Sequence, residues 1–285
     1  MGRLLHLPLA LGAASTLAGL LTILAPGLLS GPAVMNGSAR GTALVVVLIA
    51  VPSLVAGVVG ARRGSVPALS VATGATAYLV YNAVLFVFAT PFNHAFLIYE
   101  AMLGLAAFSL VALGLQLWRQ VSWLSARPPR WVAVFLWSVV GFNLLAWLST
   151  IVPALLDERP RSMLDGTGLT TNPVYVQDLA FWLPAIAWLA LGVWRQHAPR
   201  VALASAALWF WLVEAVGVAA DQWWGHHADP SSPVASGTAV PVFVCLAVVT
   251  AWPLLRLVRC LPASVEAPGV LRHDERNSGE RHRAA

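Results

Sequence analysis

Long apolar runs, separated by short polar segments, form the dominant pattern of this chain of 285 residues. Each run extends over about 20 residues, the length that an α-helix needs to cross the hydrocarbon core of a bilayer. The runs are continuous and lack the polar–apolar alternation of strands in a transmembrane barrel. We therefore predict an all-α, polytopic membrane protein with about eight transmembrane helices. The predicted spans are 5–29, 42–60, 66–89, 95–117, 131–156, 176–194, 201–220 and 239–258.

Polar segments divide the chain between these runs. We predict loops at 30–41, 157–175 and 221–238, because these segments are rich in glycine, serine or charged residues. The transmembrane domain is expected to cover residues 1–260. The charged residues 261–285 are predicted to form a disordered cytoplasmic tail, since they contain too few apolar residues to build a packed core.

Composition supports a membrane location and excludes several other classes. The chain is 59% apolar and only 10% charged, whereas soluble domains contain roughly 25% charged residues. Its net charge of +5 comes from arginines that lie between the apolar runs and in the tail, so the predicted partner is the lipid bilayer, with no nucleic acid. Cys245 and Cys260 form no zinc-binding spacing. No metal site is predicted, and the sequence indicates no particular cofactor.

The distribution of arginine predicts the orientation. With eight spans, both termini lie on one side, and that side carries fourteen of the 17 arginines. The opposite side carries Arg40, Arg159 and Arg161. Because cytoplasmic loops are enriched in basic residues, both termini are predicted to be cytoplasmic. The expected location is the cell membrane, as a multi-pass protein of a bacterial plasma membrane.

Polar side chains are concentrated in one predicted helical hairpin at 78–100. Tyr78, Tyr81 and Asn82 are three and four residues apart, so they share a helix face. Asn93 and Glu100 are seven apart and would also share a face. Further polar residues lie in later spans, at similar distances from the outer surface. The candidate ligand- or proton-binding residues are Tyr78, Tyr81, Asn82, Asn93, His94, Tyr99, Glu100, Asn143, Asp178, Glu214 and Asp221.

Two of these carboxylates suggest a function. Glu100 and Glu214 have no arginine within their own predicted spans, and an unpaired charge inside a membrane costs about 2.5 kcal/mol or more. We expect an outward-opening polar pocket among the third, fourth, fifth, sixth and seventh spans, which binds or transports a small ligand or a proton. One alternative is an intramembrane enzyme that uses a carboxylate or His94 as acid and base. Another is an accessory or sensor subunit whose polar contacts only pack helices. No catalytic residue is assigned.

A weak internal repeat of residue spacings is also present. Pro52 precedes Arg62 by ten residues, and Pro184 precedes Arg195 by eleven. Asn82 and Glu214 follow these arginines at nearly equal distances. The spacing would align the second and third spans with the sixth and seventh, giving two parallel halves of four helices. Chance spacing is the alternative.

Two motifs resemble those of an uncharacterised family of bacterial polytopic inner-membrane proteins. The first has the pair YN at 81–82, FN at 92–93, FL at 96–97 and a tyrosine at 99. The second, TNPVYVQDLA at 171–180, enters a later span and is the more specific of the two. The resemblance implies a membrane location and marks residues worth testing.

The resemblance is partial. Related sequences tend to have a second aromatic residue after the tyrosine–asparagine pair, where this chain has Ala83. Together the two motifs cover only a small part of the chain. Because the family has no assigned activity, the resemblance implies no substrate.

The arginine distribution makes a prediction about topology. Reporter domains fused at Arg127 and Ser162 are expected to give signals from opposite sides of the membrane, with Arg127 cytoplasmic. Equal signals from the two fusions would contradict the predicted arrangement.

Overall fold

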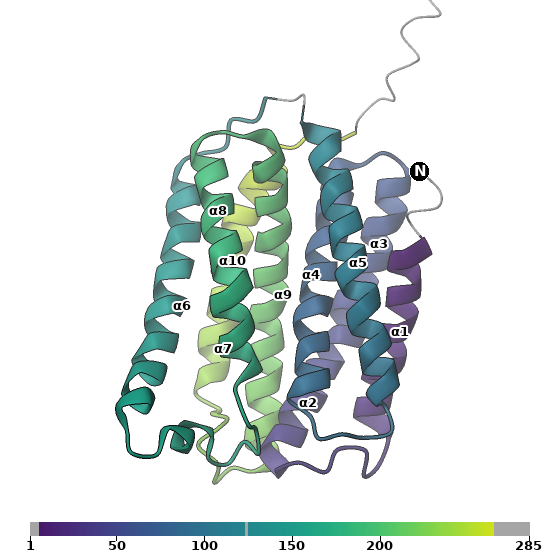
Figure 1. Cartoon of the computed structure of the whole chain (residues 1–285). Helices are drawn as coiled ribbons and strands as arrows, with labels where there is room; N and C mark the ends of the chain where they lie inside the picture. The colour runs from purple at the N-terminus through teal and green to yellow at the C-terminus, as the bar shows by residue number, and fades with distance from the viewer. Residues whose placement is uncertain (1–5, 123–124, 265–285) are drawn as a thin grey trace, which may run out of the picture.

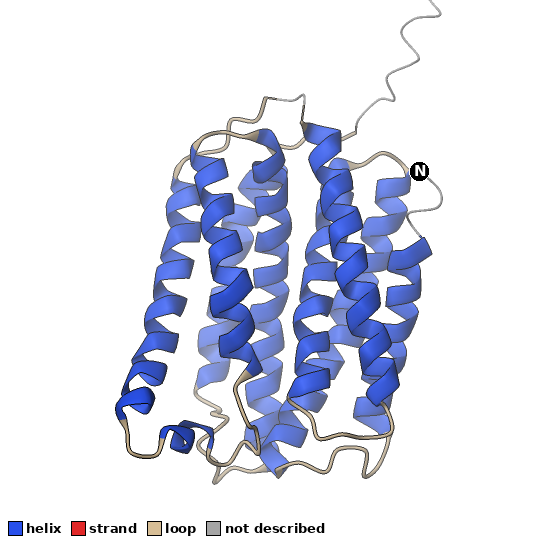
Figure 2. Ribbon diagram, in the orientation of Figure 1, coloured by secondary structure: helices blue, strands red, loops and turns tan. Residues whose placement is uncertain are grey.

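The computed structural model describes residues 6–122 and 125–264. The long segments of the described chain are all helices (Figure 2). One isolated antiparallel β-bridge joins Ser65 to Ser264. The elements in chain order are α1 His6–Leu24, α2 Ala33–Val45, η2 Val46–Ala50, α3 Val51–Arg62, α4 Val66–Phe88, α5 Phe96–Val121, α6 Trp131–Leu156, η3 Pro160–Leu164, α7 Pro173–Gln177, η4 Asp178–Trp182, α8 Leu183–Trp194, α9 Ala198–Ala228 and α10 Ala239–Val258. Here η3 is a short 3₁₀ turn, whereas η2 and η4 are π-helical turns.

Eight helices of the described chain are long and apolar enough to cross a membrane. The prediction of an all-α fold with eight spans is therefore confirmed, and the predicted bounds 131–156 and 239–258 match α6 and α10. α2, η2 and α3 together form one span, Ala33–Arg62, and α7, η4 and α8 form another, Pro173–Trp194. Because the spans alternate in direction, α1 begins and α10 ends at the same end of the bundle (Figure 1). We call this the proximal end, and the opposite one the distal end.

Two predicted loop segments are wrong at the distal end. α2 begins at Ala33, so Arg40 lies inside a helix. α9 continues to Ala228, so Asp221 also lies inside a helix. The physical reason is that these two helix ends pack against each other. Tertiary packing extends both helices through residues that hydropathy alone assigns to loops.

Small residues allow this close packing of α2 on α9. Gly37 and Gly41 are four residues apart, so they lie on one face of α2. A methyl group at Gly41 would overlap the carbonyl oxygen of Ala220, and one at Gly37 would overlap that of Trp224. Glycines at this spacing are typical of close helix contacts in membranes, where van der Waals packing replaces the hydrophobic effect.

Two groups of helices lie side by side in Figure 1. Helices α1 to α5 form one group and α6 to α10 the other, with α4 and α9 adjacent at the centre. At the proximal end, Leu261 is nearly buried, so the first residues of the predicted tail pack on the bundle. The rest of the predicted disordered tail, 265–285, lies outside the described residues.

The contact between α2 and α9 can be tested with a matched pair of glycines. Gly104 on α5 has open space around it, whereas Gly41 faces a backbone carbonyl. Alanine favours a helix over glycine by about 1 kcal/mol, so we expect G104A to be neutral or slightly stabilising. G41A should destabilise by about 1–3 kcal/mol through overpacking. Thermal unfolding in detergent would measure both variants, and equal melting temperatures would contradict the packing described here.

Candidate functional site

One cluster of polar side chains lies where α4, α6, α9 and the η4 turn converge. Tyr81 and Asn82 come from α4, Asp178 from η4 and Glu214 from α9. Tyr81, Asn82 and Asp178 are each 5% exposed or less. We call these four residues the central cluster.

Asp178 has two neighbours in the central region. Its Oδ2 accepts a 2.8 Å hydrogen bond from the indole nitrogen of Trp147 on α6. The hydroxyl of Tyr81 lies beside the same carboxylate. Both neighbours are neutral donors, so the negative charge of an ionised Asp178 has no countercharge among them.

The backbone around Asp178 is shaped by a proline. Pro184 has no N–H, and it is the second residue after the five-residue π-helical turn η4. The turn is closed by a bond from the amide of Leu183 to the carbonyl oxygen of Asp178. Turns of this kind are frequent at functional sites, because they re-aim side chains within a helix. Upstream, the Asn172 side chain caps α7 by accepting from the amide of Val174 at 2.9 Å.

Gln177 and an aromatic group hold α4, α7 and α9 together around the acids. The Gln177 amide donates to the carbonyl oxygen of Tyr81 at 3.4 Å and accepts from the Trp182 indole at 3.2 Å. The Trp182 ring stacks on Phe210, with centroids 4.7 Å apart. Tyr81 contacts both rings at centroid distances of 6.0 Å and 5.7 Å. These contacts fix the position of Tyr81 next to the carboxylates.

Glu214 has the most unusual environment in the central cluster. Its Oε2 is inaccessible to solvent and has no hydrogen-bond partner among the described residues. Asn82 lies beside the carboxylate, and one amide hydrogen of Asn82 is used by a 2.9 Å bond to the carbonyl oxygen of Tyr78. The charged groups within electrostatic range of Glu214 are themselves acidic, namely Asp178 and Asp221. Glu214 also lies near the middle of α9, about 20 Å from either end.

Tyr78 and Asp221 extend the polar region from Glu214 towards the distal end. The buried Tyr78 hydroxyl has no hydrogen-bond partner among the described residues, and it lies so close to Gly217 that a methyl group there would be 2.7 Å away. Asp221 is seven residues after Glu214 on the same face of α9. Its carboxylate accepts from Gln222 at 3.3 Å, and its backbone oxygen accepts from Ser38 at 3.4 Å.

Glu100 does not join this region. Its side chain is exposed on α5, near the distal end, so the expected inward orientation of Glu100 is wrong. The sequence indicates how deep a residue lies in a span, but helix rotation is set by packing. In α5 it is Tyr99 that points inward, and its hydroxyl shares a 2.7 Å hydrogen bond with Thr22 of α1.

The remaining candidates also lie apart from the central cluster. Asn93 forms a local turn, in which its Oδ1 accepts from the amide of Ala95 at 2.9 Å, and His94 is exposed. The Asn143 amide donates to the carbonyl oxygen of Val139 in its own helix at 2.8 Å. Within the described ranges, no group of three histidine, cysteine, aspartate or glutamate residues could hold a metal ion.

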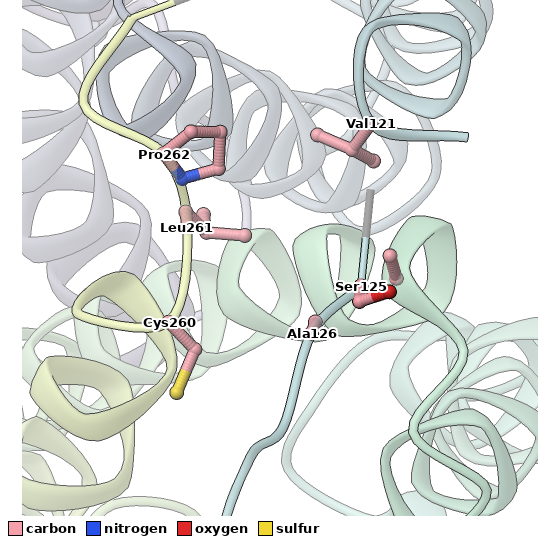
Figure 3. A pocket seen from close by; sticks show the side chains of 7 residues that line it. Val121, Ser125, Ala126, Cys260, Leu261 and Pro262 are labelled. Atoms are coloured by element: carbon pink, nitrogen blue, oxygen red, sulfur yellow. The ribbon is translucent and has the colours of Figure 1, made fainter. Parts of the chain in front are cut away.

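Two cavities lie at the ends of the bundle. The larger, of about 260 Å³, is at the proximal end between the ends of α5 and α10 and the start of α9 (Figure 3). Its lining includes Cys260, and burial raises the pKa of that thiol, which makes it a poorer nucleophile. The smaller, of about 180 Å³, is at the distal end and is lined by Asn36, Thr90 and Thr167 among others. Neither cavity is lined by a residue of the central cluster.

Several residues of the site were not predicted from the sequence. Trp147, Trp182 and Phe210 were not distinguished from the other aromatic residues of an apolar chain. Gln177 does lie in the TNPVYVQDLA motif beside Asp178, so the motif was a usable signal. Contacts between different spans, such as Trp147 with Asp178, leave no local spacing signal.

The fold and the site define a class: this is an all-helical integral membrane protein with a buried cluster of polar and acidic side chains. Comparisons of the chain with protein-family models, curated proteins and solved structures give no match. The function therefore has to be inferred from the arrangement of these side chains.

The bond between Trp147 and Asp178 gives a prediction for stability. W147F removes the donor and leaves a buried carboxylate oxygen unpaired, which should cost about 1–3 kcal/mol. W137F is a matched control on the same helix, because Trp137 also bonds to the α8 span, through the carbonyl oxygen of Ala187 at 3.3 Å, but is exposed. Thermal unfolding should show a larger loss for W147F. The bond contributes little if W147F is no less stable than W137F.

Proposed function

We propose that this protein binds a proton at Glu214 inside the membrane and transports it across the bilayer. The observation that carries the proposal is the buried Oε2 of Glu214, which lies near the middle of a span. Among the residues that the structure describes, this oxygen has neither a hydrogen-bond partner nor a basic neighbour. A carboxylate in a membrane interior is costly. Binding a proton neutralises it, and the charge returns when the proton is released.

A proton suits the tight packing of the site better than a larger ligand. Tyr81, Asn82 and Asp178 are almost completely buried and contact their neighbours directly. A proton needs no cavity of its own, only groups that can accept it and pass it on. The Tyr81 hydroxyl and the Asp178 carboxylate are such groups, and they lie next to each other.

Asp221 offers a route between Glu214 and the distal surface. The two residues are on one face of α9, about 10 Å apart along the helix axis, and the Tyr78 hydroxyl lies at Gly217, between them. We propose that a proton arriving from the distal side passes along these groups to Glu214. We propose release towards the proximal end, where the Ser70 and Ser205 hydroxyls share a hydrogen bond of 2.5 Å.

The proposed location is a bacterial plasma membrane, with both termini in the cytoplasm. The excess of arginine on the proximal side supports this orientation. The resemblance of the two sequence motifs to bacterial inner-membrane proteins supports the location. In this orientation the distal end, and with it Asp221, faces outward.

Replacing Glu214 tests the proposal. E214Q keeps the size of the side chain but cannot exchange a proton, so proton flux should fall to the level of protein-free vesicles. The measurement is the pH of a luminal dye in reconstituted phosphatidylethanolamine–phosphatidylglycerol vesicles, after a membrane potential is imposed. E100Q is the matched control, because Glu100 is a carboxylate on a neighbouring span whose side chain is exposed. E100Q should retain wild-type flux.

The same experiment separates transport from a purely structural role. If the polar residues only hold helices together, E214Q should leave any flux unchanged and alter the melting temperature at most. Wild-type flux equal to that of protein-free vesicles would also contradict the proposal.

A further inference from the structure

The helices of the two groups begin and end at equivalent positions, separated by a constant number of residues. α1 and α6 end at Leu24 and Leu156, η2 and η4 begin at Val46 and Asp178, and α4 and α9 begin at Val66 and Ala198. Within each pair the second residue lies 132 positions after the first, the separation that also relates Ser70 to Ala202. Both π-helical turns are five residues long, and both are followed by a helix of 12 residues.

Unusual local features repeat with the same separation. Pro52 and Pro184 each take the second position after a π-helical turn, and Pro67 and Pro199 each take the second position of the next helix. Between them, Gly64 has φ 85° and its counterpart Gln196 has φ 57°. Gln196 is the one non-glycine residue with positive φ in the described chain. The two counterparts therefore share a left-handed backbone conformation, which glycine adopts readily and glutamine rarely adopts.

Counterparts touch each other along the contact between α4 and α9. The Ser70 hydroxyl donates to the carbonyl oxygen of its own counterpart, Ala202, at 3.5 Å. A methyl group on Gly74 would overlap the carbonyl oxygen of its counterpart, Ala206. Further along, Asn82 lies beside its counterpart, Glu214. Contacts between counterparts on two parallel helices are those expected around a two-fold axis, which would run between α4 and α9 along the bundle.

Contacts between the two groups follow the same axis. α2 of the first group packs on α9 of the second, through Ser38 and the carbonyl oxygen of Asp221. α7, the counterpart of the end of α2, packs on α4 through Gln177 and the carbonyl oxygen of Tyr81. Parallel repeats in membrane proteins are related by an axis along the membrane normal, and substrate sites lie at the interface between the repeats.

The acids break the symmetry. Glu214 corresponds to Asn82, and Asp178 corresponds to Val46. Both carboxylates of the central cluster therefore belong to the second repeat, and the first repeat supplies a neutral amide at the axis. An amide nitrogen carries two hydrogens. In Asn82 one of them bonds to the Tyr78 carbonyl oxygen, which leaves the second for the counterpart across the axis.

We infer that the proton-binding centre lies on an internal two-fold axis, and that Asn82 is a positioning residue which holds the Glu214 carboxylate from the equivalent place in the other repeat. This inference rests on the proposed function of Glu214. Because the axis makes positions 82 and 214 equivalent, a carboxylate at position 82 occupies the same centre as one at position 214. The repeat thus defines which residues of the cluster can exchange roles.

An exchange of acid and amide tests this equivalence. N82D/E214Q swaps the two groups while each side chain keeps its size, and it should regain most of the proton flux that E214Q loses in reconstituted vesicles. Q177E/E214Q is the matched control, because Gln177 is also a buried amide of this region but its counterpart is Val45. The control should remain at the level of E214Q.

The possible results are distinguishable. If E214Q alone retains wild-type flux, the proposed function fails and this inference fails with it. If E214Q loses flux and the folded N82D/E214Q does not regain it, the equivalence is wrong although the proposed function stands. Equal recovery in Q177E/E214Q would also overturn the equivalence, since any nearby acid would then suffice.

A second exchange variant keeps the test decisive if N82D/E214Q misfolds. If N82D/E214Q is not monodisperse on size exclusion, N82E/E214N, which exchanges the two natural side chains, is measured in its place. Recovery of flux in that variant supports the equivalence of the two positions. Failure of both exchanges to fold would overturn it, because equivalent positions must accept each other's side chain.

Discussion

The absence of water in the membrane interior is the constraint on which the structure depends. In hydrocarbon, every polar group has to find a partner within the protein. Most side chains of the central region do so: Trp147 donates to Asp178, Gln177 bridges α4 and Trp182, and Asn82 bonds to the backbone of its own helix. Glu214 and Tyr78 are exceptions, since among the described residues the buried Glu214 Oε2 and Tyr78 hydroxyl have no such partner. A buried carboxylate of this kind costs stability, which is why we propose a function for Glu214.

The repeated architecture explains where Glu214 lies. Two halves of four spans meet along α4 and α9, where Ser70, Gly74 and other small residues let the backbones approach. The same contact carries Asn82 and Glu214 further along. A structure with two identical halves would place two amides or two acids there. Because one half carries the acid and the other the amide, the axis holds a single carboxylate with a neutral donor opposite.

Hydropathy was enough to predict the class, the number of spans and the bounds of α6 and α10. It was not enough for α2 and α9, since their distal ends are helical through contacts with each other and include Arg40 and Asp221. Spacing along one helix correctly brought Tyr81 and Asn82 towards the interior. It failed for Glu100, because the rotation of α5 is decided by contacts such as that of Tyr99 with Thr22. In the sequence the repeat appeared only as a weak similarity of spacing. That similarity paired Arg195 with Arg62, whereas the structural counterpart of Arg195 is Arg63.

Infrared difference spectroscopy tests the central claim most directly, since it detects proton binding at equilibrium and needs no assumption about transport. The protein in lipid is titrated over pH, and the carbonyl band of protonated carboxyl groups is followed. We predict a titrating band that is lost in E214Q and retained in E100Q. A spectrum that E214Q leaves unchanged would show that Glu214 binds no proton, and would contradict the account.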